Sequence, residues 1–257
     1  MHPTLTPHLD VALLVLYAFF LFFLGLVFYL RREDRREGYP LEDDLSGRIQ
    51  TPGGPLYDAT RKSFRLPFGH GIVTTPTGGR DPFRLAARKT ERFHGAPLVP
   101  TGDPLIDGIG PAAWAERARR PDLDMDGHPR IVPIDRAAIT IAARDPDPRG
   151  MTVVGMDGAV AGTVSDLWVD KADRLIRYLQ VTLLGEAGRQ VLVPMMMLKI
   201  DRRRRRVVVD ALRASQFANA PGIEAADRIT LYEEERVMGY FGGGYLYATA
   251  ARQEPWL

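Results

Sequence analysis

Residues 11–30 read VALLVLYAFFLFFLGLVFYL and contain no Asp, Glu, Lys, Arg or His. Twenty residues in one α-helix rise about 30 Å, which is the thickness of the hydrocarbon core of a bilayer. An amphipathic helix of a soluble core carries charged residues on its outer face, and this stretch has none. A secretory signal begins with basic residues and has a shorter apolar core before its cleavage site. The sequence therefore predicts a membrane-spanning helix over residues 11–30.

Seven charged residues, RREDRRE at 31–37, directly follow this apolar stretch. No Lys or Arg precedes it, so the positive-inside rule predicts an N-terminus outside the membrane and all later residues in the cytoplasm. Aromatic rings are enriched at the membrane boundary, and arginines beside them can reach lipid phosphates. We therefore predict a lipid interface and, directly after it, a helix break at Gly38-Tyr39-Pro40. The interface residues are Tyr29, Arg31, Arg32 and Arg35.

The composition excludes several classes of function. The net charge of the 257 residues is only +2, which does not favour a nucleic-acid binder. The chain has no cysteine, which excludes disulfides and thiolate metal sites. The five histidines are scattered and none lies in the apolar stretch, so that stretch offers no imidazole to a pigment or haem. No nucleophile elbow, phosphate loop or dinucleotide fingerprint is present, which argues against an enzyme acting alone.

Prolines concentrate between Pro40 and Pro148, where fifteen of the twenty lie. Such chain cannot form long helices or central strands, yet apolar residues punctuate it too often for a disordered segment. We predict that it is laid over the surface of a partner. Edge strands are expected at 63–67 and 71–75, and a short helix from Pro111 to Arg119.

From Met151 the pattern changes to short apolar runs separated by turn residues. Evenly spaced strands with tight turns predict a small antiparallel barrel, which removes exposed edges. A helix over 231–241 is expected next, with acids in its first turn and Gly242–Gly244 ending it. The five predicted strands are 151–154, 160–169, 175–184, 191–195 and 207–212, and the turn between the third and fourth spans 185–188.

The densest polar cluster is DLDMDGHPR at 122–130. If the chain is extended, alternate side chains share a face, and Asp122, Asp124, Asp126 and His128 could converge. A calcium loop does not fit, because the glycine comes one place late and no distal glutamate follows. A proton-collecting patch and a solvated polar turn both remain open.

Two further polar stretches can be explained by ordinary structural roles. Asp170 and Asp173 are expected at the end of a strand and in its hairpin turn, where aspartate is ordinary. The run from Arg202 to Arg206 is read as a solvated hairpin tip, since it lacks the interleaved aromatic residues of a nucleic-acid site.

Several collinear strings resemble the H subunit of the purple-bacterial photosynthetic reaction centre. They are YLRREDRREGYPLE (29–42), GAPLVPTGDPLIDGIGPAAWAER (95–117), DGHPRIVPI (126–134), DPRGMTVVGMDG (147–158), AGTVSDLWVD (161–170) and GGGYLYATAAR (242–252). The resemblance runs from about Asp10 to Arg252. It implies a single N-terminal transmembrane α-helix and a mainly β cytoplasmic domain, the small antiparallel PRC-barrel, with a short C-terminal helix.

The resemblance also implies a place and a function. The protein would sit in the inner, intracytoplasmic membrane and cap the cytoplasmic face of the L and M subunits. It would stabilise their quinone and iron region and conduct protons to the secondary quinone during light-driven cyclic electron transport. It would have no catalytic site and bind no cofactor itself. Bacteriochlorophyll, bacteriopheophytin, quinones, non-haem iron and carotenoid would belong to partner subunits.

The implied organisation has four parts. These are a periplasmic N-terminus (1–10), the span (11–30), an extended Pro/Gly-rich cytoplasmic segment on partner subunits (31–149), and the PRC-barrel-like cytoplasmic domain with its C-terminal helix (150–257). A cytochrome subunit, light-harvesting polypeptides and membrane lipids are further candidate partners, and nucleic acid is not. The alternative is a membrane-tethered PRC-barrel adaptor of another assembly.

The resemblance assigns roles by position. Proton entry falls on Asp124, Asp126 and His128, and the relay on Asp170, Asp173, Glu42, Glu234 and Arg177. Asp126 stands where the family often has a second, metal-binding histidine, so no metal site is expected there. Asp173 replaces a glutamate, and the arginines at 202–206 are outside the family pattern. Arg177 is expected beside Asp170 and Asp173, tuning their pKa values.

Overall fold

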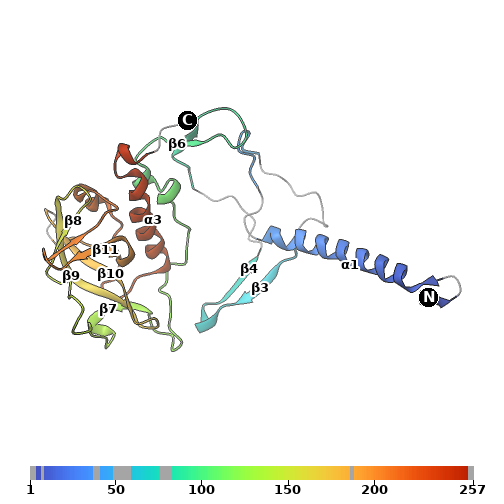
Figure 1. Ribbon diagram of the computed structural model, residues 1–257, viewed down its shortest axis with the longest axis horizontal. Helices are drawn as coiled ribbons and strands as arrows, with labels where there is room; N and C mark the ends of the chain where they lie inside the picture. Colours follow the sequence, from blue (N-terminus) through green and yellow to red (C-terminus); the bar gives the residue numbers. More distant parts are fainter. Residues whose placement is uncertain are drawn as a thin grey trace. The chain divides into compact units, whose positions relative to one another are not determined.

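The computed structural model describes residues 4–6, 9–36, 41–48, 59–75, 83–185 and 188–253. The predicted helix break at Gly38-Tyr39-Pro40 and the middle of the predicted 185–188 turn lie outside these residues. The chain divides into two compact units (Figure 1). The N-terminal unit comprises Met1–Arg84 and Glu91–Pro97, and the barrel unit comprises Leu85–Thr90 and Leu98–Leu257.

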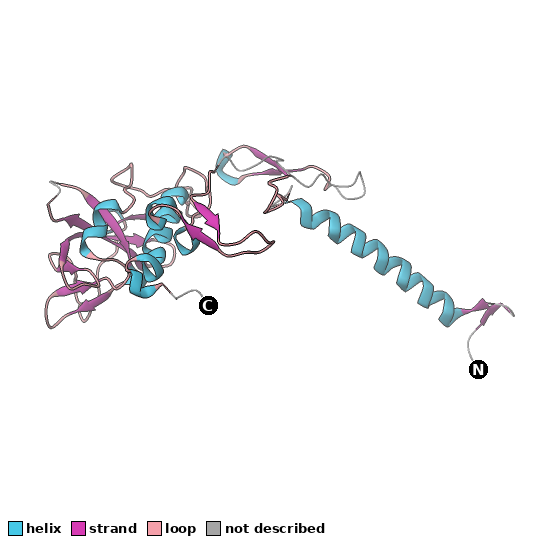
Figure 2. Cartoon of the chain, turned by 90° about the horizontal axis from the view of Figure 1, so that it is seen from above, coloured by secondary structure: helices cyan, strands magenta, loops and turns pink. Residues whose placement is uncertain are grey.

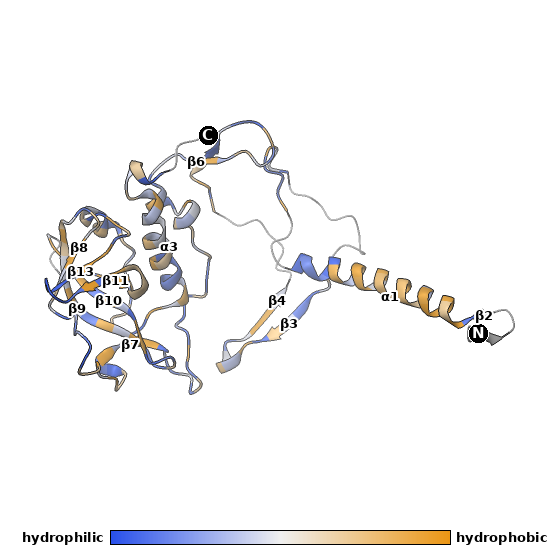
Figure 3. Cartoon of the chain, in the orientation of Figure 1, coloured by the Kyte–Doolittle hydropathy of each residue, from blue (hydrophilic) through white to orange (hydrophobic). Residues whose placement is uncertain are grey.

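The N-terminal unit is built around one long helix. A short pairing of β1 (Thr4–Thr6) with β2 (Leu9–Asp10) precedes α1 (Val11–Glu33). Asp10 caps α1, because its Oδ1 accepts a hydrogen bond from the backbone N–H of Ala12 at 2.9 Å. Figure 3 shows that the residues along most of α1 are hydrophobic. The predicted helix is confirmed, and it is three residues longer than the apolar stretch.

The C-terminal end of α1 is tied to a hairpin. The edge strands predicted at 63–67 and 71–75 are confirmed as β3 (Lys62–Arg65) and β4 (Ile72–Thr75), and the two pair antiparallel with each other. Glu33 forms an ion pair of 2.7 Å with Lys62, and Arg36 donates to the carbonyl of Thr75 at 3.3 Å. Two of the seven charged residues therefore hold protein segments together.

The barrel unit contains a seven-stranded sheet with the order β11-β10-β9-β8-β13-β12, and β7 pairs with β9 beside this path. All pairs are antiparallel except β8 with β13, which is parallel. This pair places the last strand of the sheet in sequence, β13, beside β8, which precedes β9 to β12 in the chain. The strands are β7 (Ile131–Pro133), β8 (Thr152–Val154), β9 (Val160–Asp170), β10 (Leu175–Leu183), β11 (Gln190–Pro194), β12 (Lys199–Asp201) and β13 (Arg206–Val208).

Four of the five predicted strands are confirmed within one residue at each end, while the fifth, 207–212, is strand only over β13 and its residues 209–212 lie outside it; two strands of this sheet were missed. Both β7 and β12 have only three residues, too few for a period-two pattern to stand out. The unit also takes in chain from the Pro-rich segment: β5 (Ala87–Lys89) pairs with β6 (Leu98–Pro100), and α2 (Pro104–Asp107) follows. The barrel unit therefore begins well before residue 150.

The predicted helix from Pro111 to Arg119 is wrong. Only a single 3₁₀ turn forms, at Gly110–Ala112, and Ala113 is already extended. The turn packs against α3 (Leu231–Tyr247), whose glycines leave room for its backbone. Close packing of this segment on α3 therefore overrides its local helix signal.

The predicted end of the C-terminal helix at the glycine run is also wrong, because α3 continues through it to Tyr247. A Cβ on Gly243 would lie 2.4 Å from Cβ of Ala112, and one on Gly244 would lie 2.3 Å from the carbonyl oxygen of Ala211. The glycines thus allow close approach of backbones. Figure 2 shows the helices of this unit lying among its strands.

The core of the barrel unit is made by large side chains from the sheet, the 214–219 turn and α3. The largest, all under 2 % exposed, include Trp168, Tyr178, Phe217 and Phe241. The rings of Phe217 and Phe241 meet edge to face at 5.7 Å, which joins α3 to that turn. The same core includes Tyr178 of β10 and Val237 of α3, which lie beside the site described next.

Candidate functional site

Residues 122–130 form a tight hairpin, not the extended chain that was expected. The N–H of Asp124 donates to the carbonyl of His128 at 2.9 Å, and Gly127 adopts φ +81°, a left-handed conformation suited to glycine. The turn brings ligand-type atoms of Asp124, Asp126 and His128 within 4.8 Å of one another. The three predicted entry residues therefore do converge, whereas Asp122 does not join them.

Arg130 is the centre of the acidic residues at this end of the barrel. Its Nε lies 2.9 Å from the carboxylate of Asp170, and its Nη2 lies 2.5 Å from Asp173. Its Nη1 lies 3.5 Å from Asp122, on the other strand of the hairpin. Sequence reasoning expected Arg177 in this place, and that expectation is wrong. We call Asp122, Asp124, Asp126, His128, Arg130, Asp170, Lys171 and Asp173 the acid cluster.

Asp170 is the buried member of the acid cluster, with 2 % of its surface exposed at the end of β9. Burial acts to raise the pKa of this carboxyl. The hydrogen bond from Arg130 and those from the backbone N–H groups of Asp173 and Ala172 outweigh burial, so its pKa is lowered. Asp170 is therefore a fixed negative charge at neutral pH.

Asp124 is a second fixed charge, near the surface. Lys171 donates to its Oδ2 at 2.8 Å, and the backbone N–H groups of His128 and Asp126 donate to its Oδ1. These contacts, that of Lys171 foremost, lower the pKa of Asp124 to about 2. Asp126 and His128 are exposed beside it. They are the most exposed ionisable residues of the hairpin.

Glu234, in the first turn of α3, lies on the inner side of the acid cluster. An isolated bridge pairs Pro121 with Thr230, which lays the start of the hairpin along the start of the helix. Burial raises the pKa of Glu234, and the charges of Asp122 and Asp170 raise it further. The hydroxyl of Tyr178 donates to it at 3.0 Å, and this bond and the charge of Arg177 oppose the rise.

The three acids of that first turn have different partners, although the sequence assigned all of them to the helix dipole. Glu233 forms a capping box with Thr230, accepting from its N–H at 2.8 Å. Glu235 pairs with Arg117 at 2.9 Å. Glu234 alone is directed at the β10 tyrosine, and it is half-buried within electrostatic reach of Asp122 and Asp170.

Two family models match the chain. Residues 3–136 match the photosynthetic reaction centre H-chain N-terminal region. The chain belongs to the reaction centre H-chain family. Residues 141–216 of this H chain match the PRC-barrel domain, which covers most of the sheet just described. The H chain is accordingly a subunit of a reaction-centre complex, and α1 makes it a single-pass membrane protein.

The remaining predicted site residues of the H chain lie in its N-terminal unit. Glu42 and Tyr29 are exposed, Arg31 is exposed, and Arg32 and Arg35 are half-buried at the end of α1 and just beyond it. Glu42 belongs to a different compact unit from the acid cluster. Its role in the relay stays a prediction.

Three important residues in or beside the acid cluster were missed: Arg130, Lys171 and Tyr178. Only Arg130 had a local signal, since a tight hairpin centred on Gly127 would place it opposite Asp122. Tyr178 and Glu234 are 56 positions apart, and no spacing rule links them. Their contact depends on the packing of α3 against the sheet.

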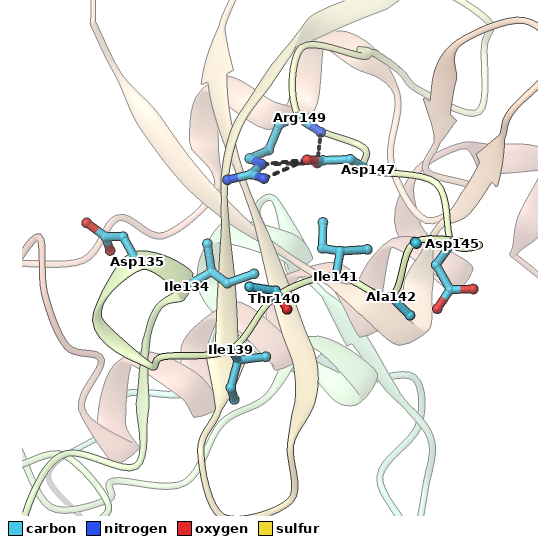
Figure 4. Close-up of a pocket in the computed structure, with 10 residues that line it drawn as sticks. Ile134, Asp135, Ile139, Thr140, Ile141, Ala142, Asp145, Asp147 and Arg149 are labelled. Atoms are coloured by element: carbon cyan, nitrogen blue, oxygen red, sulfur yellow. Dashed lines mark hydrogen bonds and ion pairs between the residues drawn. The ribbon is translucent and has the colours of Figure 1, made fainter.

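A separate surface groove of about 450 Å³ lies on the barrel unit of the H chain (Figure 4). Isoleucines 134, 139 and 141 line it, and an ion pair of 2.6 Å between Arg149 and Asp147 borders it. That arginine lowers the pKa of Asp147. None of the groove residues belongs to the acid cluster, so the groove has no part in the site.

Replacing Glu234 with glutamine should change how the stability of the H chain depends on pH. A carboxyl whose folded pKa lies above its ordinary value of 4.5 stabilises the fold below that pH, and this contribution is lost as the pH rises through the folded pKa. Glutamine keeps an oxygen for the Tyr178 hydroxyl and does not ionise. The melting temperature of the variant minus that of the wild type should therefore increase between pH 4.5 and 8. If the melting temperatures of the two proteins changed with pH by the same amount, the raised pKa of Glu234 would be contradicted.

Proposed function

We propose that this H chain conducts protons from the cytoplasm toward the secondary quinone of its complex, and that it caps the L and M subunits over the quinone and iron region. Membership of the H-chain family supports the subunit role. Double reduction of a quinone builds negative charge in a medium of low dielectric constant, and protons must arrive to neutralise it. The H chain would supply the route for these protons.

The observation that carries this proposal is a fall in exposure from Asp126 to Asp170 among neighbouring ionisable groups, with a carboxyl of raised pKa, Glu234, beyond them. Asp126 is exposed, the side chain of Asp173 is 50 % exposed, and Asp170 is 2 % exposed. Arg130 connects Asp170 with Asp173, and Glu234 lies within electrostatic reach of Asp170. Acids that lead from water toward a half-buried carboxyl with a raised pKa, here Glu234, are a suitable relay.

The structure supports different roles for these groups. Asp124 and Asp170 have lowered pKa values, so they act as fixed anions that attract protons without holding them for long. Asp126 and His128 would take protons from water, since both are exposed. Glu234 would be the inner carrier, because its raised pKa brings its titration closer to neutral pH.

Exposed apolar side chains in the Pro-rich segment support the capping role. Large exposed apolar surfaces on a folded chain usually mark contacts with other proteins or with membranes. Several such side chains, each between 46 and 70 % exposed, occur from β3 onward: Phe64, Phe68, Ile72, Phe83, Leu85, Phe93, Leu98 and Ile106. Phe68 also has φ +54° at the tip of the β3–β4 hairpin, and a partner surface would offset such strain.

The test is flash excitation of the purified complex carrying variants of this chain. Glu234→Gln should slow proton-coupled transfer of the second electron at least about tenfold at neutral pH, since a positioned proton donor contributes about 10²–10⁴-fold. The double change Asp170→Asn with Asp173→Asn should slow it too, because it removes the fixed anion and the half-exposed acid that attract protons toward Glu234. Primary charge separation should be unchanged. A small weak acid added to the buffer should restore part of the rate by carrying protons through water.

Asp135→Asn is the matched control, because Asp135 is an exposed acid outside the acid cluster. Its kinetics should equal those of the wild type. Normal quinol formation in the cluster variants would overturn the assigned route. If transfer of the second electron were slow and added weak acid did not restore its rate, the variants would have altered electron transfer itself. That result would also reject proton conduction by these residues.

A further inference from the structure

A second group of metal-ligand side chains lies in the N-terminal unit, away from the acid cluster. Asp43 and Asp44 lie in the turn that follows Leu41, and His94 comes fifty positions later. Nδ1 of His94 lies 2.6 Å from Oδ1 of Asp44 and 3.9 Å from Oδ2 of Asp43. One candidate ligand atom from each residue lies within 4.8 Å of the others.

Neighbouring donors orient both carboxylates toward the imidazole. Oδ1 of Asp43 accepts from the N–H and the hydroxyl of Ser46, at 2.7 and 2.6 Å, which leaves Oδ2 on the imidazole side. Oδ2 of Asp44 accepts from the N–H of Gly95 at 2.9 Å, while Oδ1 faces His94. Each carboxylate therefore has one oxygen held and one directed inward. Such outer contacts orient metal ligands and strengthen binding.

We propose that Asp43, Asp44 and His94 bind a divalent transition-metal ion of the Zn²⁺ class. One imidazole nitrogen and two carboxylate oxygens suit Zn²⁺, which accepts nitrogen and oxygen ligands and can complete its shell with water. The side chain of His94 is 69 % exposed, so an ion can enter from solvent. Binding would displace the proton shared by the imidazole and Asp44, and the ion would then bridge the two groups.

The metal would join two segments that are distant in sequence. The 41–48 turn is closed by its own backbone bonds, among them Gly47 N–H to the carbonyl of Asp43 at 2.8 Å. The loop at His94 meets it through side-chain contacts of Asp43 and Asp44. A bound ion would convert these exposed contacts into a cross-link, which stabilises the joined state by mass action.

The hairpin cluster of Asp124, Asp126 and His128 is a weaker candidate for the same ion. Lys171 donates to Asp124 at 2.8 Å, so an ammonium group already occupies one carboxylate oxygen there. The inference about the N-terminal unit does not depend on the proton route. It would stand if that route were rejected.

The test uses the full chain in detergent, without a histidine tag, titrated with Zn²⁺ at pH 7 by calorimetry. His94→Gln should weaken the tightest Zn²⁺ site at least tenfold, whereas His128→Gln should leave that site unchanged. Far-UV circular dichroism of both variants should match the wild type. Equal Zn²⁺ affinity in the wild type and the His94 variant, or loss of the site in the His128 variant only, would overturn the assignment.

Limited trypsin digestion tests the cross-link directly. Arg48 and Arg92 are exposed and lie close in sequence to the two halves of the site. Saturating Zn²⁺ should slow cleavage after both arginines several-fold in the wild type and in the His128→Gln variant. It should have no effect in His94→Gln. Zn²⁺ that binds without protecting either arginine would show that the ion does not join the segments.

Discussion

Replacing Arg130 with methionine should lower the free energy of unfolding of the barrel unit by about 3 kcal/mol, because removing one partner of a buried ion pair leaves the other charge uncompensated. The stranded charge is Asp170, which is 2 % exposed. The side chain of Arg130 is 29 % exposed, which keeps the expected loss at the lower end of the usual range. For a domain of this size the melting temperature should fall by roughly 6–12 °C.

The loss should depend on pH in a definite direction. In the wild type the lowered pKa of Asp170 stabilises the fold above its ordinary value of 3.8, and this contribution disappears as the pH falls through the folded pKa. Without Arg130, burial dominates and raises the pKa of Asp170, so acid should favour the variant. The difference between wild type and variant should therefore be smaller at pH 4 than at pH 7.

Two further variants make this prediction specific. Arg149→Met removes an arginine from an exposed pair with Asp147, whose side chains are 46 and 43 % exposed, and should cost at most about 1 kcal/mol. Adding Asp170→Asn to Arg130→Met should recover part of the stability, since the stranded charge is gone. Equal losses for Arg130→Met and Arg149→Met, measured by thermal melts in detergent, would show that the acid cluster is no more than a surface ion-pair network.

The position of Arg130 beside Asp170 and Asp173 could not be predicted from the sequence. Local patterns predicted α1 and the strands of the hairpin 160–183, because twenty apolar residues and alternating short runs identify them without tertiary information. Asp170 and Asp173 were likewise placed correctly at the strand end and in the turn. The cation that neutralises them lies forty positions earlier in a separate hairpin. No local period encodes that contact.

The mistaken elements share a physical cause with the missed arginine. The 111–119 helix and the stop at the glycine run were both inferred from local propensity, and tertiary packing decides both. The 3₁₀ turn at Ala112 packs directly against the glycines of α3. The conformation of either segment therefore depends on the other. A family resemblance supplied the site positions, but it could not supply the partners that set their pKa values.

Gly244→Ala and Gly242→Ala should change stability in opposite directions, although both glycines lie in α3. Alanine is favoured over glycine inside a helix by about 0.8–1.0 kcal/mol. A Cβ on Gly242 would meet nothing closer than the carbonyl oxygen of Pro111 at 3.6 Å, an ordinary contact. Gly242→Ala should therefore stabilise the fold by roughly 0.5–1 kcal/mol.

At Gly244 the steric conflict outweighs the helix propensity. The new Cβ would lie 2.3 Å from the carbonyl oxygen of Ala211 and 2.7 Å from Cδ2 of Leu212. The carbonyl cannot move aside cheaply, because the guanidinium of Arg252 donates to it at 3.1 Å and to the carbonyl of Gly244 at 2.9 Å. Overpacking costs about 1–3 kcal/mol, and a contact this short with backbone belongs at the upper end, so a net loss of about 2 kcal/mol is expected after the helix-propensity gain of about 1 kcal/mol is subtracted.

Thermal melts of the two variants in the same detergent measure the difference directly. With about 2–4 °C per kcal/mol, Gly244→Ala should melt roughly 4–8 °C below the wild type and Gly242→Ala slightly above it. Arg252→Met in the Gly244→Ala background should recover part of the loss, since it frees the Ala211 carbonyl to move. If both alanines raised the melting temperature equally, the glycine run would be only a flexible stretch of helix, and the close contact of α3 with residue 211 would have to be abandoned.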